Sequence, residues 1–207
     1  MASNDAQLVS FNALLAPAME TDEKREALLG KLKIGIHSQV EIPFAKRYEL
    51  VTPVTVGAKG AHSSSAAPSN VQTVSQAFCS ALSIAYTCGT DSAWEPIAQV
   101  VLDATYEATL WAAALEHAAG MGTGKVYLTF IGGGVFGNRN AWISSAIARA
   151  CAKLDHLPLE VVVCHYRQIR SEVQQGIDDM YVGQGGGGPP PIPPRSSDGA
   201  SAHFTGI

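Results

Sequence analysis

The chain has little positive charge. Its 207 residues include 14 Lys and Arg against 18 Asp and Glu, which gives a formal net charge of −4. A protein that contacts many phosphates of a nucleic acid needs a basic surplus, because those contacts are made largely by Lys and Arg. Nucleic acid is therefore not expected as a main partner.

Long apolar runs and paired cysteines are also missing. No apolar stretch approaches the roughly 20 residues that cross a bilayer, and no basic and apolar leader opens the chain. The cysteines show no C-x-x-C pair and no histidine at metal-ligand spacing. They are Cys79, Cys88, Cys151 and Cys164. We expect reduced core cysteines, no metal or other cofactor, no membrane contact, and a cytoplasmic or nuclear protein that is not secreted.

The 46% apolar content is enough for one core, and the length fits one domain. We expect an amino-terminal extension over 1–20 and an α/β domain over 21–178, with a flexible loop over 57–70. Gly and Pro dominate 179–207, which predicts a disordered tail. Pro190 to Arg195 fits P-x-x-P-x-R, a polyproline II pattern that SH3-type partners bind. We favour the interpretation that this segment is a proline-rich spacer.

The first elements of the domain are a helix and a set of strands. Thr21 or Asp22 can cap a helix that stops at Gly30. Alternation predicts a half-buried strand over 32–37 and a second strand over 48–56, which Pro53 confines to an edge. Residues 71–87 are apolar without a clean period, so we expect a short strand and then a buried segment.

The later elements alternate between helix and strand. A long helix is predicted over 94–119 with Pro96 in its first turn, a strand covered on both faces over 125–131, a helix over 141–153 and a buried strand over 159–166. The apolar stripe predicted for the long helix is Ile97, Val100, Val101, Ala104, Ala108, Trp111 and Leu115. The order from 125 onward predicts a parallel βαβ crossover and a layered α/β domain.

Charged and aromatic residues on these helices have ordinary explanations. Asp103, Glu107 and Glu116 are expected on a solvated face of the long helix. The three tryptophans are expected as core or interface anchors. They are Trp94, Trp111 and Trp142. Cys79, Ser80 and His165 show no spacing typical of a nucleophile with its base, so we expect structural roles for them.

A glycine cluster between the strand predicted over 125–131 and the following helix points to chemistry. Gly132, Gly133, Gly134 and Gly137 fall within six residues before a helix, where backbone amides and the helix dipole favour an anion. A tight turn would also explain glycine here, but four exceed what a turn usually needs. The alternative of a dinucleotide fold lacks the acid at the end of the next strand; Arg167 or Arg170 would have to serve a 2′-phosphate instead.

Residues 104–166 resemble the carboxyl-terminal half of a macro domain, in the order helix, strand, G-V-F-G loop, helix, strand. The form GGGVFGN also resembles the second ligand loop of poly(ADP-ribose) glycohydrolase-like macro folds. Val74 to Leu82 and Trp94 to Pro96 resemble segments of uncharacterised macro-like proteins. The resemblance implies a three-layer α/β/α domain with a mixed, largely parallel sheet, and it leaves open whether the first strands are present.

The same resemblance implies ADP-ribose or a related nucleotide diphosphate as the ligand. The ligand loop would run from Gly132 and Gly133 to Asn138, and the amides from Gly134 to Gly137 would hold the diphosphate. The Phe136 ring would lie against the distal ribose, and the Asn138 side chain would add a hydrogen bond. Positions Gly134, Val135, Phe136 and Gly137 carry the matching motif. The first macro loop, with an asparagine and a glycine run, has no counterpart here. ADP-ribosyl hydrolysis therefore stays open, and the alternative is a degenerate, non-enzymatic structural or interaction domain.

Overall fold

Helices and two short sheets make up the part of the chain that the structure describes. The computed structural model describes residues 4–41, 73–87, 89–165 and 174–179. Its α-helices are α1 (Asn4–Leu15), α2 (Asp22–Leu29), α3 (Asp91–Ala118) and α4 (Asn140–Lys153), and its 3₁₀ helices are η1 (Ala16–Met19) and η3 (Ile84–Tyr86). Residues 174–179 are also helical.

The described strands form one antiparallel and one parallel pair. Strand β1 (Gly35–Glu41) pairs antiparallel with β2 (Thr73–Phe78), and β3 (Lys125–Thr129) pairs parallel with β4 (Glu160–Cys164). The mixed α/β composition predicted from the sequence is thus confirmed. Strand β1 begins three residues later than the alternation of 32–37 predicted, while β2 matches the short strand expected within 71–87. The segment after β2 was expected to be buried, which holds for Ile84 but is wrong for Tyr86, which is 69% exposed.

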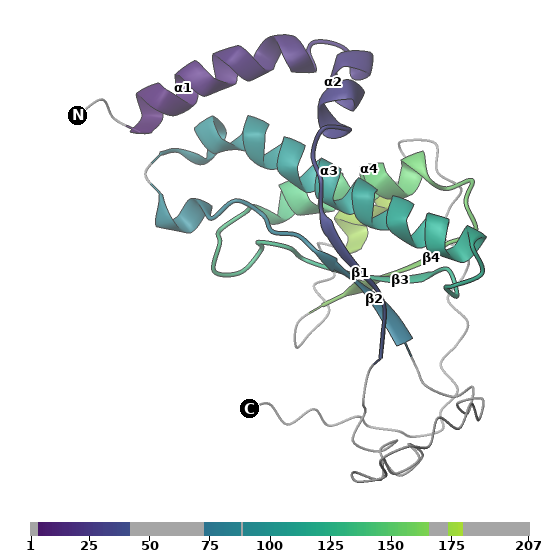
Figure 1. The fold of residues 1–207 in the computed structure, drawn as a ribbon. Coiled ribbons are helices and arrows are strands. Elements are labelled where there is room, and N and C mark those ends of the chain that lie inside the picture. The colour runs from purple at the N-terminus through teal and green to yellow at the C-terminus, as the bar shows by residue number, and fades with distance from the viewer. Residues whose placement is uncertain (1–3, 42–72, 88, 166–173, 180–207) are drawn as a thin grey trace, which may run out of the picture.

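The predicted βαβ crossover is present as β3, α4 and β4. In Figure 1, α3 and α4 run side by side over the strands, and the core between them includes buried Val126 and Leu128 of β3. Tyr127, between these two residues, points to the opposite face of the strand and is 63% exposed. The expectation that this strand is covered on both faces is therefore wrong among the described residues. A mainly apolar run in the sequence does not show whether one face or both faces of the strand are covered, because a tyrosine can also occupy an open face.

Helix α3 is the centre of the described structure. Residues 102–107 are all buried, and six consecutive residues cover more than one helical turn, so this part of the helix is enclosed on every side. The face against α4 and β3 consists of Ala98, Leu102, Tyr106 and Leu110. The predicted stripe was wrong at its end, since Trp111 is 40% exposed and Leu115 is 67% exposed. A helix that is apolar nearly all round offers two stripes, and tertiary packing selects between them.

The start of α3 also differs from the prediction. The helix begins at Asp91, so Pro96 lies in its second turn, not its first. A proline has no amide hydrogen, so Pro96 cannot donate to the carbonyl four residues earlier, that of Ser92. The preceding Thr90 has extended backbone angles, as a residue that begins a helix should.

The amino-terminal helices pack on the outer side of α3. Leu15 and Leu29 form a small core with Val100 and Ala104 of α3. Thr21 caps α2 by accepting a hydrogen bond from the Lys24 amide, and the helix ends at Gly30, as the sequence predicted. Helix α1 occupies part of the stretch that we expected to be a polar extension, and Figure 1 shows it lying across α3.

Several expectations fall outside the described residues. These are the strand over 48–56, the loop over 57–70, the proline-rich tail with Pro190 to Arg195, and Cys88. Of the helices that the structure describes, none combines the length and the apolar character that crossing a membrane requires.

Candidate ligand site in the glycine loop

The glycine loop joins the carboxyl end of β3 to the amino terminus of α4, as its sequence predicted. Two tight turns shape it, closed by backbone hydrogen bonds from Gly133 to Phe130 (3.2 Å) and from Gly137 to Gly134 (3.1 Å). Residues 134–137, which form the second of these turns, are exposed. The loop therefore presents a short stretch of backbone on the surface beside a helix start.

Two of the four glycines are required by backbone geometry. Gly132 and Gly137 have φ of +77° and +75°, a region that residues with a Cβ rarely adopt. A Cβ on Gly132 would also collide with Ala81 and Asn138, and one on Gly137 would lie 3.0 Å from the Cβ of Ala85. These positions need glycine whether or not the loop binds a ligand.

The other two glycines differ from one another. A Cβ on Gly133 would lie 3.0 Å from Cδ1 of Ile143, which is tight packing in the core. A Cβ on Gly134 would have no described atom within 4 Å, and its φ is not positive. Gly134 is therefore the glycine for which the structure supplies no steric reason.

Asn138 ties the loop to the segment before η3. It is 4% exposed, and its Nδ2 donates to the carbonyl of Leu82 at 2.7 Å and to that of Gly132 at 3.4 Å. Beside it, the Ala85 amide donates to the carbonyl of Phe136 at 3.0 Å. The Asn138 Oδ1 is buried and has no partner among the described residues. A ligand bond from this side chain would thus have to use Oδ1 as the acceptor.

Tyr106 of α3 holds the start of the loop, a role that the sequence did not indicate. Its hydroxyl donates to the carbonyl of Thr129 at 2.7 Å and accepts from the amide of Ile131 at 3.1 Å. Burial raises the pKa of Tyr106, so the phenol stays protonated and keeps its donor. Tyr106 lies off the predicted apolar stripe; the available signal was an aromatic residue with a polar group inside an apolar helix.

The exposed residues of the loop have backbone amides without acceptors. Among the described residues, none accepts a hydrogen bond from the amides of Gly134, Val135 or Phe136. The Val135 side chain is 72% exposed and that of Phe136 is 36% exposed. This surface therefore combines three amides that have no acceptor among the described residues with one partly exposed aromatic ring.

The amino terminus of α4 adds uncompensated positive potential. Arg139 at its N-cap makes no capping bond, and its first turn holds no acid, whereas α2 has a capping Thr21 and two acids in its first turn. The Arg139 side chain instead pairs with Asp91, with Nε 2.7 Å from Oδ2. An anion at this helix start would take the place of the missing cap.

A cavity of about 1070 Å³ lies elsewhere, between β2 and β3. None of residues 132–138 lines it. The glycine loop therefore lies outside this cavity, and its residues 134–137 are exposed on the surface.

The residues weighed for nucleophilic chemistry do not form a hydrogen-bonded set. Burial raises the pKa of the Cys79 thiol, Ser80 donates to the neighbouring carbonyl of Ala81, and His165 lies 3.4 Å from the Gln174 side chain. A raised pKa opposes the thiolate that a cysteine nucleophile needs. These contacts support the structural roles expected from the sequence.

With the geometry of the loop described, similarity to other proteins can be considered. No protein-family model, no curated protein and no solved structure matches this chain. The assignment of a ligand therefore depends on the chemistry of the site.

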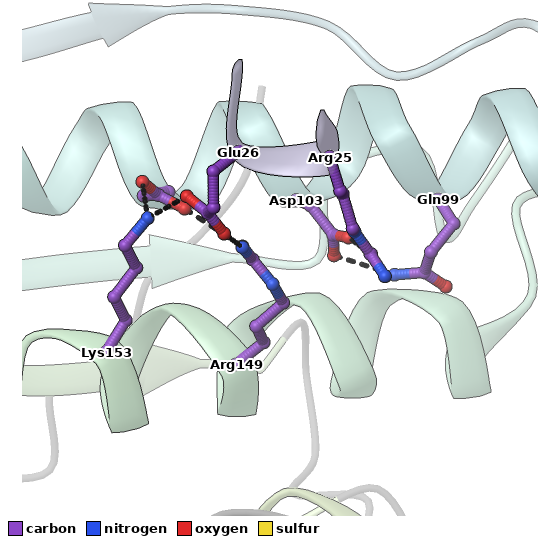
Figure 2. Close-up of polar contacts among 7 residues, drawn as sticks. Arg25, Glu26, Gln99, Asp103, Arg149 and Lys153 are labelled. Atoms are coloured by element: carbon purple, nitrogen blue, oxygen red, sulfur yellow. Dashed lines mark hydrogen bonds and ion pairs between the residues drawn. The ribbon is translucent and has the colours of Figure 1, made fainter. Parts of the chain in front are cut away.

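A charge cluster joins α2 to α3 and α4 (Figure 2). We define it as Arg25, Glu26, Gln99, Asp103, Glu107, Arg149 and Lys153. Asp103 is fully buried, pairs with Arg25 and accepts from Gln99 at 2.9 Å. The expectation that the acids of this helix lie on a solvated face is thus wrong for Asp103 and Glu107.

Glu107 and Glu26 share the same two basic partners, and Glu107 is the more buried of the two acids. Arg149 Nη1 lies 2.9 Å and Lys153 Nζ 2.6 Å from its two oxygens, and both bases also contact Glu26. Burial alone would raise the pKa of Glu107, but these hydrogen bonds and charges hold it below its usual value. The cluster balances three acids against three bases, so it fastens α2 to the core without leaving a net charge in place.

We expect the contribution of Glu107 to stability to disappear in acid. Its pKa is lower in the folded state than in the unfolded chain, so its stabilisation is present above about pH 4.3 and is lost as the pH falls through the folded-state value. Glu107→Gln should therefore unfold at lower urea concentration than the wild type near pH 7, and the difference should shrink toward pH 3. The control is Glu20→Gln, which removes an exposed acid. A difference that stays constant across this range would contradict the assignment.

Proposed function

We propose that this protein binds ADP-ribose or a related nucleotide diphosphate at the glycine loop. The observation that carries the proposal is the exposed run from Gly134 to Phe136, whose amides have no acceptor among the described residues. This run lies three residues before α4, whose N-cap Arg139 makes no capping bond. Backbone amides at a helix start stabilise a diphosphate without a basic surface, which agrees with a net charge of −4.

The position and side chains of the loop support a nucleotide over a simple inorganic anion. Gly134 has no packing partner that requires glycine, so the absence of a side chain there leaves room for a phosphate. The partly exposed Phe136 ring next to it offers an apolar face for a ribose or base. Together they favour a ligand with both a diphosphate and a sugar.

A macro-like fold is the finer part of the proposal. The likeness of residues 104–166 to the carboxyl-terminal half of a macro domain supports it, and so does the parallel β3–α4–β4 unit with the loop at the carboxyl end of its first strand. In such a fold the strands would belong to one three-layer α/β/α domain. The proposal is for binding, and ADP-ribosyl hydrolysis stays open. The described contacts of the loop with residues 81–85 are backbone groups and alanine methyls, which by themselves perform no acid–base chemistry.

We expect Gly134→Glu to weaken nucleotide binding by at least about 10-fold while leaving the fold intact. The new carboxylate would occupy the phosphate position and repel the ligand, and the open space around residue 134 allows the larger side chain. Titration calorimetry with ADP-ribose, ADP and NAD measures the affinities, and circular dichroism checks the fold. Val9→Glu, on an exposed position of α1, adds the same charge away from the loop and should bind as the wild type does. Equal affinity in Gly134→Glu would exclude this loop.

A structural or interaction domain without a ligand site is the second candidate function. It is favoured by one observation: Gly132, Gly133 and Gly137 are explained by backbone geometry and packing alone, partly against residues 81–85. If the folded wild-type protein gives neither heat nor a thermal shift with any of the three nucleotides, this second candidate replaces the first.

A further inference from the structure

An ion pair joins the starts of α3 and α4 beside the glycine loop. Arg139, the N-cap residue of α4, directs Nε and Nη2 to Oδ2 of Asp91, at 2.7 and 2.5 Å. Asp91 is the first residue of α3, and both helices begin at the same end of the described structure (Figure 1). The pair therefore lies where two helix starts, each with positive potential, come together.

Two backbone hydrogen bonds place Arg139 next to the exposed part of the loop. The Asn138 amide donates to the carbonyl of Gly132 at 3.0 Å, and the Gly137 amide donates to that of Gly134 at 3.1 Å. These bonds fold the loop back on itself, and Arg139 is the next residue in the chain. Its side chain thus starts beside the loop amides that have no acceptor among the described residues.

The ion pair uses only part of the Arg139 guanidinium. Both contacts go to a single oxygen of Asp91, and no described residue accepts a hydrogen bond from Nη1. A guanidinium binds most strongly when two of its nitrogens meet two oxygens of one group, an arrangement that a phosphate offers. A phosphate is therefore a better partner for Arg139 than Asp91 is in this geometry.

The exposure of the pair makes it easy to break. The side chains of Arg139 and Asp91 are 59% and 46% exposed. Ion pairs in such positions stabilise a protein little, because water screens both charges. Arg149 of the charge cluster is different, since its side chain is only 18% exposed and contacts two acids. Arg139 is thus a cation that can exchange one anion for another at little cost.

We propose that Arg139 is a phosphate ligand at the glycine loop and that Asp91 competes with the nucleotide for it. This inference rests on the proposed function, because it adds a side chain to the same site. In the free protein Arg139 pairs with Asp91, and in the complex it turns to the diphosphate on the amides from Gly134 to Phe136. The exchange supplies a full positive charge, which backbone amides lack, and leaves the Asp91 carboxylate at a helix start that stabilises it.

Two substitutions at the pair should change nucleotide affinity in opposite directions. Arg139→Met should weaken the binding of ADP-ribose and ADP by at least about 10-fold, because charged hydrogen bonds to phosphate are lost. Asp91→Asn should tighten binding by about 2- to 5-fold, because the competing anion is gone. Arg139→Lys keeps the charge without the planar fork and should bind with an affinity between those of the wild type and Arg139→Met. Titration calorimetry on the full chain measures the affinities.

The opposite signs distinguish a phosphate ligand from a pair that only fastens two helices. A purely structural pair would loosen the loop in both variants, so weaker binding in both Arg139→Met and Asp91→Asn would overturn the inference while the proposed function stands. Unchanged affinity in Arg139→Met would do the same. If Arg139→Met does not fold, as circular dichroism would show, the sign of the Asp91→Asn effect decides.

The control and the wild type complete the test. Lys24→Met removes an exposed positive charge from α2, away from the loop, and should bind as the wild type does. A loss in Lys24→Met equal to that in Arg139→Met would indicate a general charge effect and overturn the inference. A folded wild-type protein that binds neither nucleotide would overturn the proposed function and this inference together.

Discussion

Arg149→Met is expected to lower the free energy of unfolding by about 3 kcal/mol. Arg149 is 18% exposed at its side chain and contacts Glu107 and Glu26, both at the junction of α2, α3 and α4 (Figure 2). Removing one partner from a buried ion pair costs about 3–5 kcal/mol, because the remaining charge is left without compensation. The lower end of that range applies, since Lys153 still contacts both acids. Urea unfolding followed by circular dichroism measures the change.

Two controls separate the buried pair from a general charge effect. Lys24→Met removes one partner of an exposed pair, Lys24 with Glu20, and should change the free energy of unfolding by less than about 1 kcal/mol. Arg149→Met combined with Glu107→Leu should recover part of the loss, because the uncompensated carboxylate is then gone as well. If Arg149→Met and Lys24→Met cost the same, the cluster does not fasten α2 to the core.

Gly132→Ala is expected to destabilise the protein by about 3 kcal/mol. The backbone at Gly132 has a φ of +77°, which costs a residue with a Cβ about 1–2 kcal/mol, and the new methyl group would collide with Ala81 and Asn138. Crowding of this kind adds about 1–3 kcal/mol. The collision would also disturb the bonds from Asn138 that hold residues 81–85 to the loop. Thermal and urea unfolding measure the loss.

The matched variant is Gly134→Ala, two residues further along the same loop. A Cβ there has no described atom within 4 Å, so its effect on the free energy of unfolding should stay within about 0.5 kcal/mol. This pair of variants distinguishes glycines that shape the loop from the one that leaves room for a ligand. A large loss of stability in Gly134→Ala would mean that all four glycines serve the backbone.

Local patterns predicted the carboxyl-terminal half of the described fold well. The amphipathic period placed α4 within one residue of its start, and the apolar runs on either side gave β3 and β4 with the parallel pairing that a crossover helix imposes. The same patterns placed the glycine loop at the strand end. All of this information lies within about 40 consecutive residues.

The predictions that failed depend on distant residues. Asp103 was expected in solvent, but Arg25, 78 positions away, provides its buried partner; Glu26 and Arg149 are 123 positions apart. No local pattern encodes which helix will cover a polar face, so a carboxylate on an enclosed helix is indistinguishable from one on an open helix. For the loop, sequence could not separate Gly134 from Gly132, because that distinction depends on the contacts of Gly132 with Ala81 and Asn138 and on its positive φ.

The way α1 and α2 are attached has a consequence for the order of folding. The 30 residues between β3 and β4 include α4 itself, so this unit closes a short loop and gains its parallel pairing and much of the core locally. The amino-terminal helices instead meet α3 across about 80 positions, through the Asn12 contact with Ala93 and the bond between Arg25 and Asp103. Their docking depends on a surface that β3, α4 and β4 must first hold in shape. We therefore expect the amino-terminal helices to join after the β3–α4–β4 unit has formed and to leave before it on unfolding.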